Sequence, residues 1–549
     1  MTITWEAPAG GLWALDTLHL TGAVPRLFQE RAPDALERGF RPLSQRYGLP
    51  IDYLEFRFVN DHCYARMRAV GAPDPKPGKE TSPPPGFVLW LLARLHPELR
   101  RRGRAATAAL AERVWHDDLA RWEGELKGDM LTTGRALQTE DVTAMSDDEL
   151  IDHVGRVAHH MAHGLEVHFD LIAVHNIPLG RLVALTRRHG ISDVDALALL
   201  AGSSPASTAS AEALGPIARA CRAVGVVPQS LDDVRAAGPE ASAALDSYLA
   251  DHAWRMITQY TPRGQALIEL PNLLVQAIRC AGDAAERTEP DAAPIRARVA
   301  EADRARFDDL LADARRCYGI RDDNVGLTCM WPVGLVRRTI LEAGRRLVAR
   351  GTIDEDWVAF SLGEQELAAA LRGDAVMGEL AKTRAEEGIA AEAAGAPTTL
   401  GWSEGGDPDP KVFPKAMAEI TAAIIDTLVL EEGMVPDGSP TTWTGDGIGV
   451  GTESYTGRAC VAASPEEALA KLEPGDVLVT IMTTPAYEAI LPIAGAVVTE
   501  QGGLISHTAL MARELGLPAV VGVAGATGAI PDGAKVEVDP TSGRVRIND

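Results

Sequence analysis

The sequence predicts a multidomain chain in which a mainly α-helical region is followed by a small α/β domain. The length of 549 residues corresponds to three or four domains of roughly 150 residues each. From about residue 87 to 390, apolar residues recur at three- and four-residue intervals, which is the period of amphipathic helices. From about residue 440, short β-branched runs alternate with turn residues, which is typical of strands.

The composition excludes a disordered chain and disfavours two classes of partner. With 46% hydrophobic and 24% charged residues, the chain can bury a sizeable core. Its 53 basic against 77 acidic residues give a net charge of −24, so neither nucleic acid nor an anionic membrane is an expected partner. The N-terminus lacks the features of a signal peptide, no long uninterrupted apolar run occurs, and the six cysteines form no CxxC pair. We therefore expect a cytoplasmic protein with free thiols and no metal site.

The elements follow in order along the chain. Residues 1 to about 70 are compatible with short strands beside a helix, and the Pro/Gly-rich run 71–86 must be a loop. Helices fill the rest of residues 1–390, which we predict to be a mainly helical domain. One example is the segment 147–169, with apolar residues on one face, and another ends at Gly351.

A change in composition separates the last domain from the helices. Residues 391–439 comprise a Gly/Pro-rich linker, about 392–410, and a bridging helix. Residues 440–549 contain four predicted strands, in GDVLVTIM, AGAVVTE, PAVVGV and AKVEVD. This part is large enough for one independent α/β domain.

The segment 496–523 is the most informative part of the sequence. A strand ends in a turn at Gly502 and Gly503, and a helix then starts near Ser506 and stops at Gly516. His507 therefore lies in the first turn of a helix, where unpaired N–H groups and the helix dipole favour phosphate. Neutral imidazole can attack phosphorus near pH 7. This arrangement suits a phosphohistidine, although a histidine in such a place can also be an ordinary surface residue.

The same segment resembles the phosphohistidine swivelling domain of the phosphoenolpyruvate-utilising enzymes. The resemblance is carried by GG-x-x-SH, then AREL-G-x-PAVVG, from Gly502 to Gly522. It is supported by GDVLVT at 475–480, by Thr484-Pro485 in place of the family's T-x-P, and by DGAKVEVDPTSGRV at 532–545. The segment with which the family approaches phosphate has a different sequence here, GTESYTG at 451–457.

The resemblance implies roles for individual residues. His507 would accept and donate the phosphoryl group, Ser506 and Thr508 would bind phosphoryl oxygens or simply cap the helix, and Gly502 and Gly503 would form the close turn. Arg513 would contact phosphate or form a structural ion pair.

The resemblance also implies a donor on another polypeptide. We find no P-loop and no sequence pattern typical of an ATP-grasp domain. The residues after His507 are too few for a barrel of ~250 residues. An ATP-grasp subunit that binds ATP and Mg²⁺ is therefore the expected partner. No tightly bound cofactor is expected on this chain. ATP and phosphoenolpyruvate both remain open as the ultimate donor.

Residues 1–390 more weakly resemble the substrate domain of rifampicin phosphotransferase and related enzymes that phosphorylate phenols. The matching pieces include Trp13 to Asp16 with His19, and Tyr248 with Arg255. His19, His252 or a histidine between His153 and His175 could be a general base. This resemblance implies a small phenolic or otherwise hydroxylated acceptor, and a phenylphosphate synthase-type division between subunits.

We therefore expect a phosphotransferase of the dikinase type, which yields AMP and phosphate. Two alternatives stay open. One is a non-enzymatic phosphocarrier or regulatory protein, and the other is a component of a phosphotransferase that acts on a rifamycin-like antibiotic.

Overall fold

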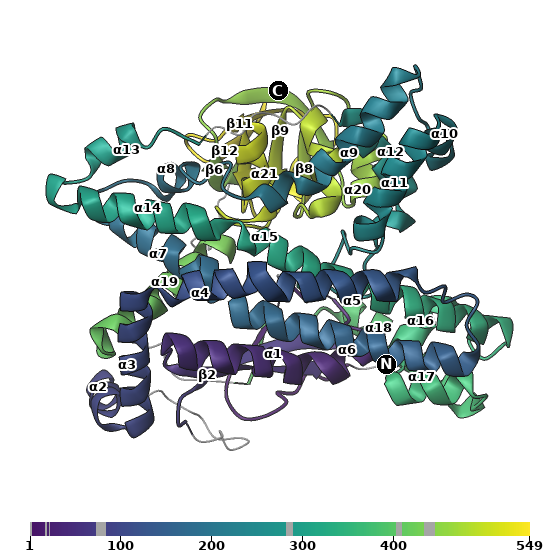
Figure 1. The fold of residues 1–549 in the computed structure, drawn as a ribbon, viewed down its shortest axis with the longest axis horizontal. Coiled ribbons are helices and arrows are strands. Elements are labelled where there is room, and N and C mark those ends of the chain that lie inside the picture. The colour runs from purple at the N-terminus through teal and green to yellow at the C-terminus, as the bar shows by residue number, and fades with distance from the viewer. Residues whose placement is uncertain are drawn as a thin grey trace. The chain divides into compact units, whose positions relative to one another are not determined.

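A computed structural model describes residues 3–16, 19–20, 22–72, 84–281, 289–401, 409–432 and 445–548 (Figure 1). The chain forms two compact units, and neither is continuous in sequence. The first unit contains Met1–Val174, Trp254–Ala266 and Asn324–Ala422. The second contains His175–Ala253, Leu267–Asp323 and Ala423–Asp549.

The first unit combines long helices with a four-stranded sheet of order β2-β3-β1-β4. Its strands are β1 Trp13–Leu15, β2 Ile51–Val59, β3 His62–Ala69 and β4 Thr399–Leu400. Its helices are α1 Arg26–Tyr47, α2 Gly86–Leu95, α3 Pro97–Glu112, α4 Val114–Arg121, η1 Trp122–Leu126, α5 Lys127–Thr139, α6 Asp147–Leu171, η4 Gly326–Met330, α16 Trp331–Ala349, η5 Asp356–Ser361, α17 Glu364–Leu371, α18 Ala375–Ala394 and η6 Pro410–Val412.

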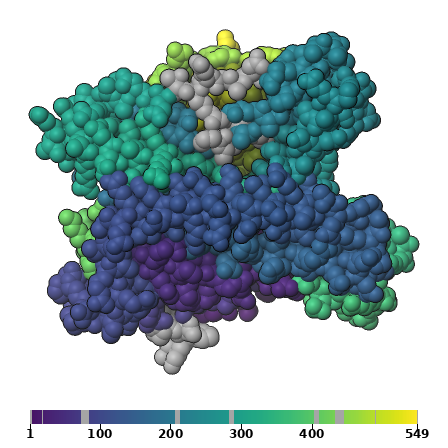
Figure 2. Space-filling model, in the orientation of Figure 1, coloured from purple at the N-terminus to yellow at the C-terminus, as the bar shows by residue number. Residues whose placement is uncertain are grey.

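Helix α6 is the central helix of this unit. It begins with a capping box, in which the Ser146 hydroxyl accepts from the Glu149 amide and the Glu149 carboxylate accepts from the Ser146 amide. Helices α1 and α16 and the η4 turn pack against it. Figure 2 shows the blue side chains of the long helices packed directly against the purple N-terminal residues. The stretch Asp147–Arg188 is long and apolar enough to cross a membrane, but 67% of its most apolar window is buried inside the protein, as in a core helix.

His160 on α6 makes the stability of the first unit sensitive to acid. Its side chain is buried, and its Nε2 has no hydrogen-bond partner in the part of the chain that the structure describes. Burial, together with His163 and His159, lowers the pKa of His160 to about 4. A histidine in an unfolded chain has a pKa of about 6.5, so the unfolded chain binds more protons between these two values. The free energy of unfolding should therefore fall as the pH drops from about 6.5 to about 4, by up to about 3 kcal/mol.

Urea unfolding at about pH 7.5 and about pH 5 measures this loss, and the His160→Leu variant is the comparison. We expect the variant to lose less stability on acidification than the wild type. An equally steep loss in both proteins would contradict the assignment to His160.

The second unit joins an eight-stranded sheet to helices from the middle of the chain. Its helices are α8 Asp193–Ala198, α9 Pro205–Ala223, α10 Leu231–Ala236, α11 Pro239–His252, η2 Leu267–Glu269, α12 Pro271–Cys280, α13 Ala293–Arg298, η3 Glu301–Asp303, α14 Arg304–Tyr318, α20 Pro465–Lys471, η7 Pro485–Ala489, η8 Leu491–Ile493, α21 His507–Leu515 and α22 Ala526–Ala529. Its strands are β5 Gly445–Asp446, β6 Ile448–Val450, β7 Tyr455–Val461, β8 Val477–Thr480, β9 Ala496–Thr499, β10 Ala519–Val521, β11 Lys535–Asp539 and β12 Arg544–Asn548. Three helices, α7 Ala173–Arg188, α15 Ile320–Val325 and α19 Lys415–Glu432, lie across the unit boundaries.

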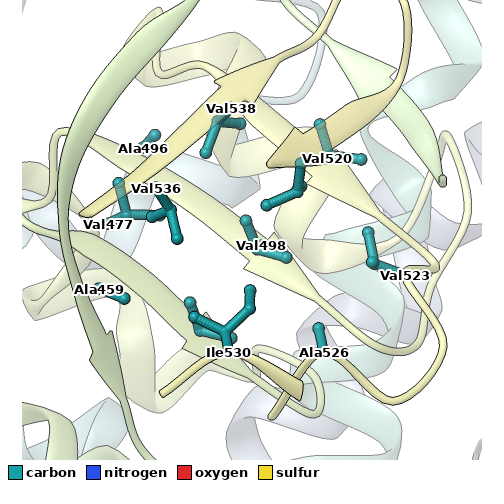
Figure 3. Close-up of a cluster of buried hydrophobic side chains, with 12 residues drawn as sticks. Ala459, Val477, Ala496, Val498, Val520, Val523, Ala526, Ile530, Val536 and Val538 are labelled. Carbon is teal, nitrogen blue, oxygen red and sulfur yellow. The ribbon is translucent and has the colours of Figure 1, made fainter. Parts of the chain in front are cut away.

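The sheet runs in the order β5-β12-β11-β7-β8-β9-β10-β6, with β7, β8, β9 and β10 parallel to one another. Its strands are rich in valine, and alternate side chains point to one face, as the pleat of a strand requires. These side chains form a buried cluster to which the loop around α22 adds Val523, Ala526 and Ile530 (Figure 3). The C-terminal α/β domain and the helical N-terminal region expected from the sequence are confirmed.

The predicted boundaries at 390 and 439 remain a prediction, and the compact units divide the chain at other places. Within the predicted linker, Thr399–Leu400 forms β4 and pairs with β1 of the first unit. The bridging helix is present as α19, Lys415–Glu432. Residues 402–408 of the linker, 433–444 and the part 73–83 of the Pro-rich loop lie outside the described residues.

Candidate active site

His507 lies where a strand of the C-terminal sheet passes into a helix. Strand β9 ends at Thr499, α21 begins at His507, and β10 returns parallel to β9. In parallel sheets, ligands bind at the edge formed by the carboxyl ends of the strands. The Ser506 hydroxyl caps the helix by accepting from the Ala509 amide at 3.4 Å. The first N–H groups of α21 and its dipole therefore favour a negative charge beside His507.

The glycine turn holds the backbone close to the site. Gly502 has φ +107°, and a Cβ atom at this position would lie 2.9 Å from the Ser506 side chain, so a larger residue is strained here. The Gly503 amide donates to the Glu431 carbonyl at 3.0 Å, and the Ile505 amide donates to the Leu430 carbonyl at 3.2 Å. The last turn of α19 thus ties down the loop that precedes His507.

The imidazole of His507 has a different neighbour at each nitrogen. Its Nδ1 lies 2.9 Å from the Thr483 Oγ1, which in turn lies 2.8 Å from the Thr508 Oγ1. Among the residues that the structure describes, its Nε2 has no hydrogen-bond partner; this atom is buried and lies 3.7 Å from the Glu488 Oε1. When Nδ1–H donates to Thr483, Nε2 keeps its lone pair. Nε2 is then the nitrogen available for chemistry.

Arg513 supports the loop before His507. Its guanidinium is largely enclosed and donates to the carbonyls of Leu504 and Ala509. Burial, and the nearby Arg321, lower the pKa of Arg513, while Tyr318 raises it. The adjacent Glu514 accepts from the Gly202 amide at 3.0 Å. Arg513 thus binds backbone carbonyls in this structure, and its contact with phosphate remains a prediction.

Sequence reasoning missed Thr483 and Glu488. It matched Thr484-Pro485 to the family's T-x-P pattern, but Thr483 is the threonine that stands two residues before Pro485 and contacts the imidazole. The spacing T-x-P was therefore present in the sequence. Glu488 carries no such signal, because its approach to His507 depends on the course of the chain after β8.

The candidate acceptor residues do not form one cluster. Asp16, His19 and Arg255 belong to the first unit, and His252 to the second. The Asp16 carboxylate accepts from the His19 amide at 2.8 Å and lies 3.7 Å from the His19 Nδ1. The Arg255 guanidinium lies 5.8 Å from the ring of Trp331.

The side chains of Tyr260 and His168 lie near His19. Its ring meets that of Tyr260 edge-on at 5.9 Å. Burial, with a contribution from His19, lowers the pKa of His168 to about 4, and the Nδ1 of His168 has no hydrogen-bond partner among the described residues. In the second unit, the His252 ring stacks on Tyr248 at 4.4 Å, and its Nδ1 lies 3.0 Å from the Tyr248 carbonyl. The polar side chains near the predicted acceptor residues of the N-terminal segment are thus those of Asp16, His19, Tyr260 and His168.

The histidines of α6 have structural surroundings. His153 lies 3.1 Å from the Glu140 carboxylate, next to Arg156, while His159 and His163 point outward and His160 is buried. Within the residues that the structure describes, no three histidine, cysteine or acidic side chains gather in a way that could hold a metal ion.

The site thus defines an α/β domain with a histidine at the start of the helix that follows a parallel strand. Residues 472–543 match the family of the PEP-utilising enzymes, mobile domain. The resemblance to the swivelling domain of phosphoenolpyruvate-utilising enzymes is thereby confirmed for this part of the chain.

Similar proteins match parts of this chain. The chain is 44% identical over 115 residues to a phosphoenolpyruvate synthase from Aeropyrum pernix, which covers 21% of this chain and 14% of that protein. It is 44% identical over 113 residues to a rifampicin phosphotransferase from Streptomyces sviceus, 21% of this chain and 12% of that protein. It is 30% identical over 321 residues to an uncharacterised protein from Mycobacterium tuberculosis, 58% of this chain and 33% of that protein. The chain thus spans at most a third of the length of these relatives.

Proposed function

We propose that this chain is a phosphotransferase component that carries a phosphoryl group on His507 and transfers it to the hydroxyl of a small phenolic substrate. A partner ATP-grasp subunit, which binds ATP and Mg²⁺, supplies the phosphoryl group. Of the two phosphoryl groups removed from ATP, one passes to water and is released as inorganic phosphate, and the other passes to His507, which leaves AMP. The names of the relatives support the chemistry, since they include a phosphoenolpyruvate synthase and a rifampicin phosphotransferase.

The observation that carries the proposal is the setting of the His507 imidazole. Thr483 holds Nδ1, so that the lone pair of Nε2 is directed away from the threonine pair. The N-terminus of α21 and the neighbouring Ser506 and Thr508 hydroxyls suit a bound phosphoryl group. Phosphoryl transfer needs in-line placement and charge stabilisation more than it needs covalent help, and the helix N-terminus contributes to the charge stabilisation.

Transfer then takes place in two steps that share one nitrogen. In the first, the Nε2 lone pair attacks phosphorus and the donor oxygen leaves. In the second, an acceptor oxygen attacks the same phosphorus, and the P–N electron pair returns to Nε2. The His19, Asp16, Tyr260 and His168 group is the candidate acceptor site. Because donor and acceptor sites cannot occupy one place, the histidine domain must move between them.

Product analysis tests this function. The chain is incubated with a candidate ATP-grasp partner, Mg²⁺ and either ATP or phosphoenolpyruvate, together with phenols, aliphatic alcohols and a rifamycin. Mass spectrometry follows the nucleotides and the phosphorylated products. We expect AMP, phosphate and a phosphorylated phenol with ATP as donor.

Other results would change the proposal in defined ways. A phosphorylated rifamycin in place of a phenol would move the acceptor to the antibiotic class. A phosphorylated protein without any small-molecule product would contradict an enzyme and favour a phosphocarrier.

A further inference from the structure

A carboxylate faces the one nitrogen of His507 that Thr483 leaves open. The Glu488 Oε1 lies 3.7 Å from the His507 Nε2, and among the described residues this nitrogen has no hydrogen-bond partner. The side chains of His507 and Glu488 are 22% and 21% exposed, but the Nε2 atom itself is buried from solvent. A carboxylate in this position lies next to the place where a phosphoryl group on Nε2 would sit.

The backbone that carries Glu488 is firmly held. Glu488 lies in the short η7 turn, and the preceding residue, Tyr487, is buried. The Tyr487 amide donates to the Thr484 carbonyl at 2.9 Å, and its hydroxyl lies 3.0 Å from the Thr480 Oγ1 at the end of β8. Burial raises the pKa of Tyr487 to about 12, so this anchor stays protonated. Helix α12 also packs against η7.

We propose that Glu488 is the general base of the second transfer step, a role that rests on the proposed function of His507. As the acceptor oxygen attacks phosphorus, its proton passes to the Glu488 carboxylate. The O–P bond forms, the P–Nε2 bond breaks, and its electron pair returns to the imidazole. The carboxylate side chain turns from Nε2 toward the attacking oxygen, and it must reach hydrogen-bond distance, about 2.6–3.2 Å, for the proton to move.

This placement has a consequence for the moving domain. Glu488 and His507 belong to the same α/β domain, so the base travels with the phosphoryl group to any acceptor. A base from the substrate-binding helices is then not required. The carboxylate also faces the phosphoryl group when water is the acceptor, so that it should act on hydrolysis of the phosphohistidine in the same way.

A small phosphoryl donor makes the second step measurable without the partner subunit. Potassium phosphoramidate phosphorylates histidine and releases ammonia. The full chain is labelled with it, excess donor is removed, and loss of phosphohistidine is followed by ³¹P NMR with water, phenol or 4-nitrophenol as acceptor. The Glu488→Gln variant keeps the shape of the side chain and removes the base. The matched control is Glu473→Gln, on the same domain, where the side chain is 77% exposed.

We expect Glu488→Gln to take up the label to the same extent as the wild type and to lose it to water and phenol about 10²-fold or more slowly. The acidic 4-nitrophenol needs less help from a base, so its transfer should be slowed far less. Glu473→Gln should behave as the wild type.

The two hypotheses fail in distinguishable ways. Equal rates of phosphohistidine loss in Glu488→Gln and the wild type would contradict the role of Glu488 as general base. The same holds if the variant slows transfer to phenol and to 4-nitrophenol by equal factors. If the wild type transfers to water but to no phenol, the phenolic acceptor is contradicted, while the comparison of hydrolysis rates still decides the role of Glu488. If phosphoramidate labels a His507→Ala variant as well as the wild type, the proposed function itself fails.

Discussion

Replacing His507 by alanine is expected to abolish phosphoryl labelling of the chain by ATP and its partner subunit. The imidazole has a lone pair suited to attack phosphorus near neutral pH, whereas Ser506, Thr483 and Thr508 are un-ionised hydroxyls. The structure places its Nε2 free of hydrogen bonds, whereas its Nδ1 is held at 2.9 Å by Thr483. The effect should therefore be a complete loss rather than a partial one.

Labelling with ³²P on the β and γ positions of ATP, followed by gel electrophoresis under alkaline conditions, measures this loss. The control variant is His163→Ala, which removes an outward-pointing histidine of α6 and should leave labelling unchanged. In the wild type, ³¹P NMR should place the phosphoryl group on Nε2. Label that persists in His507→Ala would show that another residue is the acceptor.

Replacing Gly164 by alanine is expected to lower the stability of the first unit strongly. Gly164 lies on α6 where the helix crosses η4, and a Cβ atom there would stand 2.0 Å from the Thr328 carbonyl oxygen. That oxygen is backbone and cannot turn aside, so the two elements must separate. Overpacking of this kind costs about 1–3 kcal/mol, and sometimes more, and a contact this short belongs at the upper end.

The matched control for this prediction lies on the same helix. A Cβ atom at Gly155 would meet only the end of the Glu364 side chain, at 3.5 Å, which is an ordinary contact. Alanine is a better helix former than glycine by about 1 kcal/mol. In urea unfolding we therefore expect Gly164→Ala to lower the midpoint clearly and Gly155→Ala to leave it unchanged or raise it. A Gly164→Ala protein as stable as the wild type would contradict the close crossing of α6 and η4.

Local patterns predicted four of the eight strands of the C-terminal sheet and the helix that carries His507. The four β-branched runs are β8, β9, β10 and β11, and the helix after the glycine turn is α21, capped by Ser506 and closed by Gly516 at φ +65°. The bridging helix has the expected extent, Lys415–Glu432. These features depend on propensity, caps and turns within a few residues, so the order of the residues is sufficient to specify them.

The neighbours of the His507 side chain could be identified only from the tertiary structure. Thr483 precedes His507 by 24 positions, and the two meet because β8 and β9 are parallel neighbours whose carboxyl ends share one edge of the sheet. The T-x-P spacing could have pointed to Thr483, but nothing in the sequence pointed to Glu488. Its distance to Nε2 is decided by the η7 turn and by the buried Tyr487 that anchors it.

The sequence also did not predict which segments of the chain form each compact unit. Residues 175–253 and 267–323 look like a continuation of the N-terminal helices, yet they belong to the same unit as the C-terminal sheet. Helical period shows which face of a helix is apolar, but not which distant surface will cover that face. The position of His507 at the start of a helix was therefore determined by adjacent residues, because caps and turns act over a few positions. The neighbours of His507 and its unit were decided by tertiary packing, because burial joins apolar faces regardless of their separation along the chain.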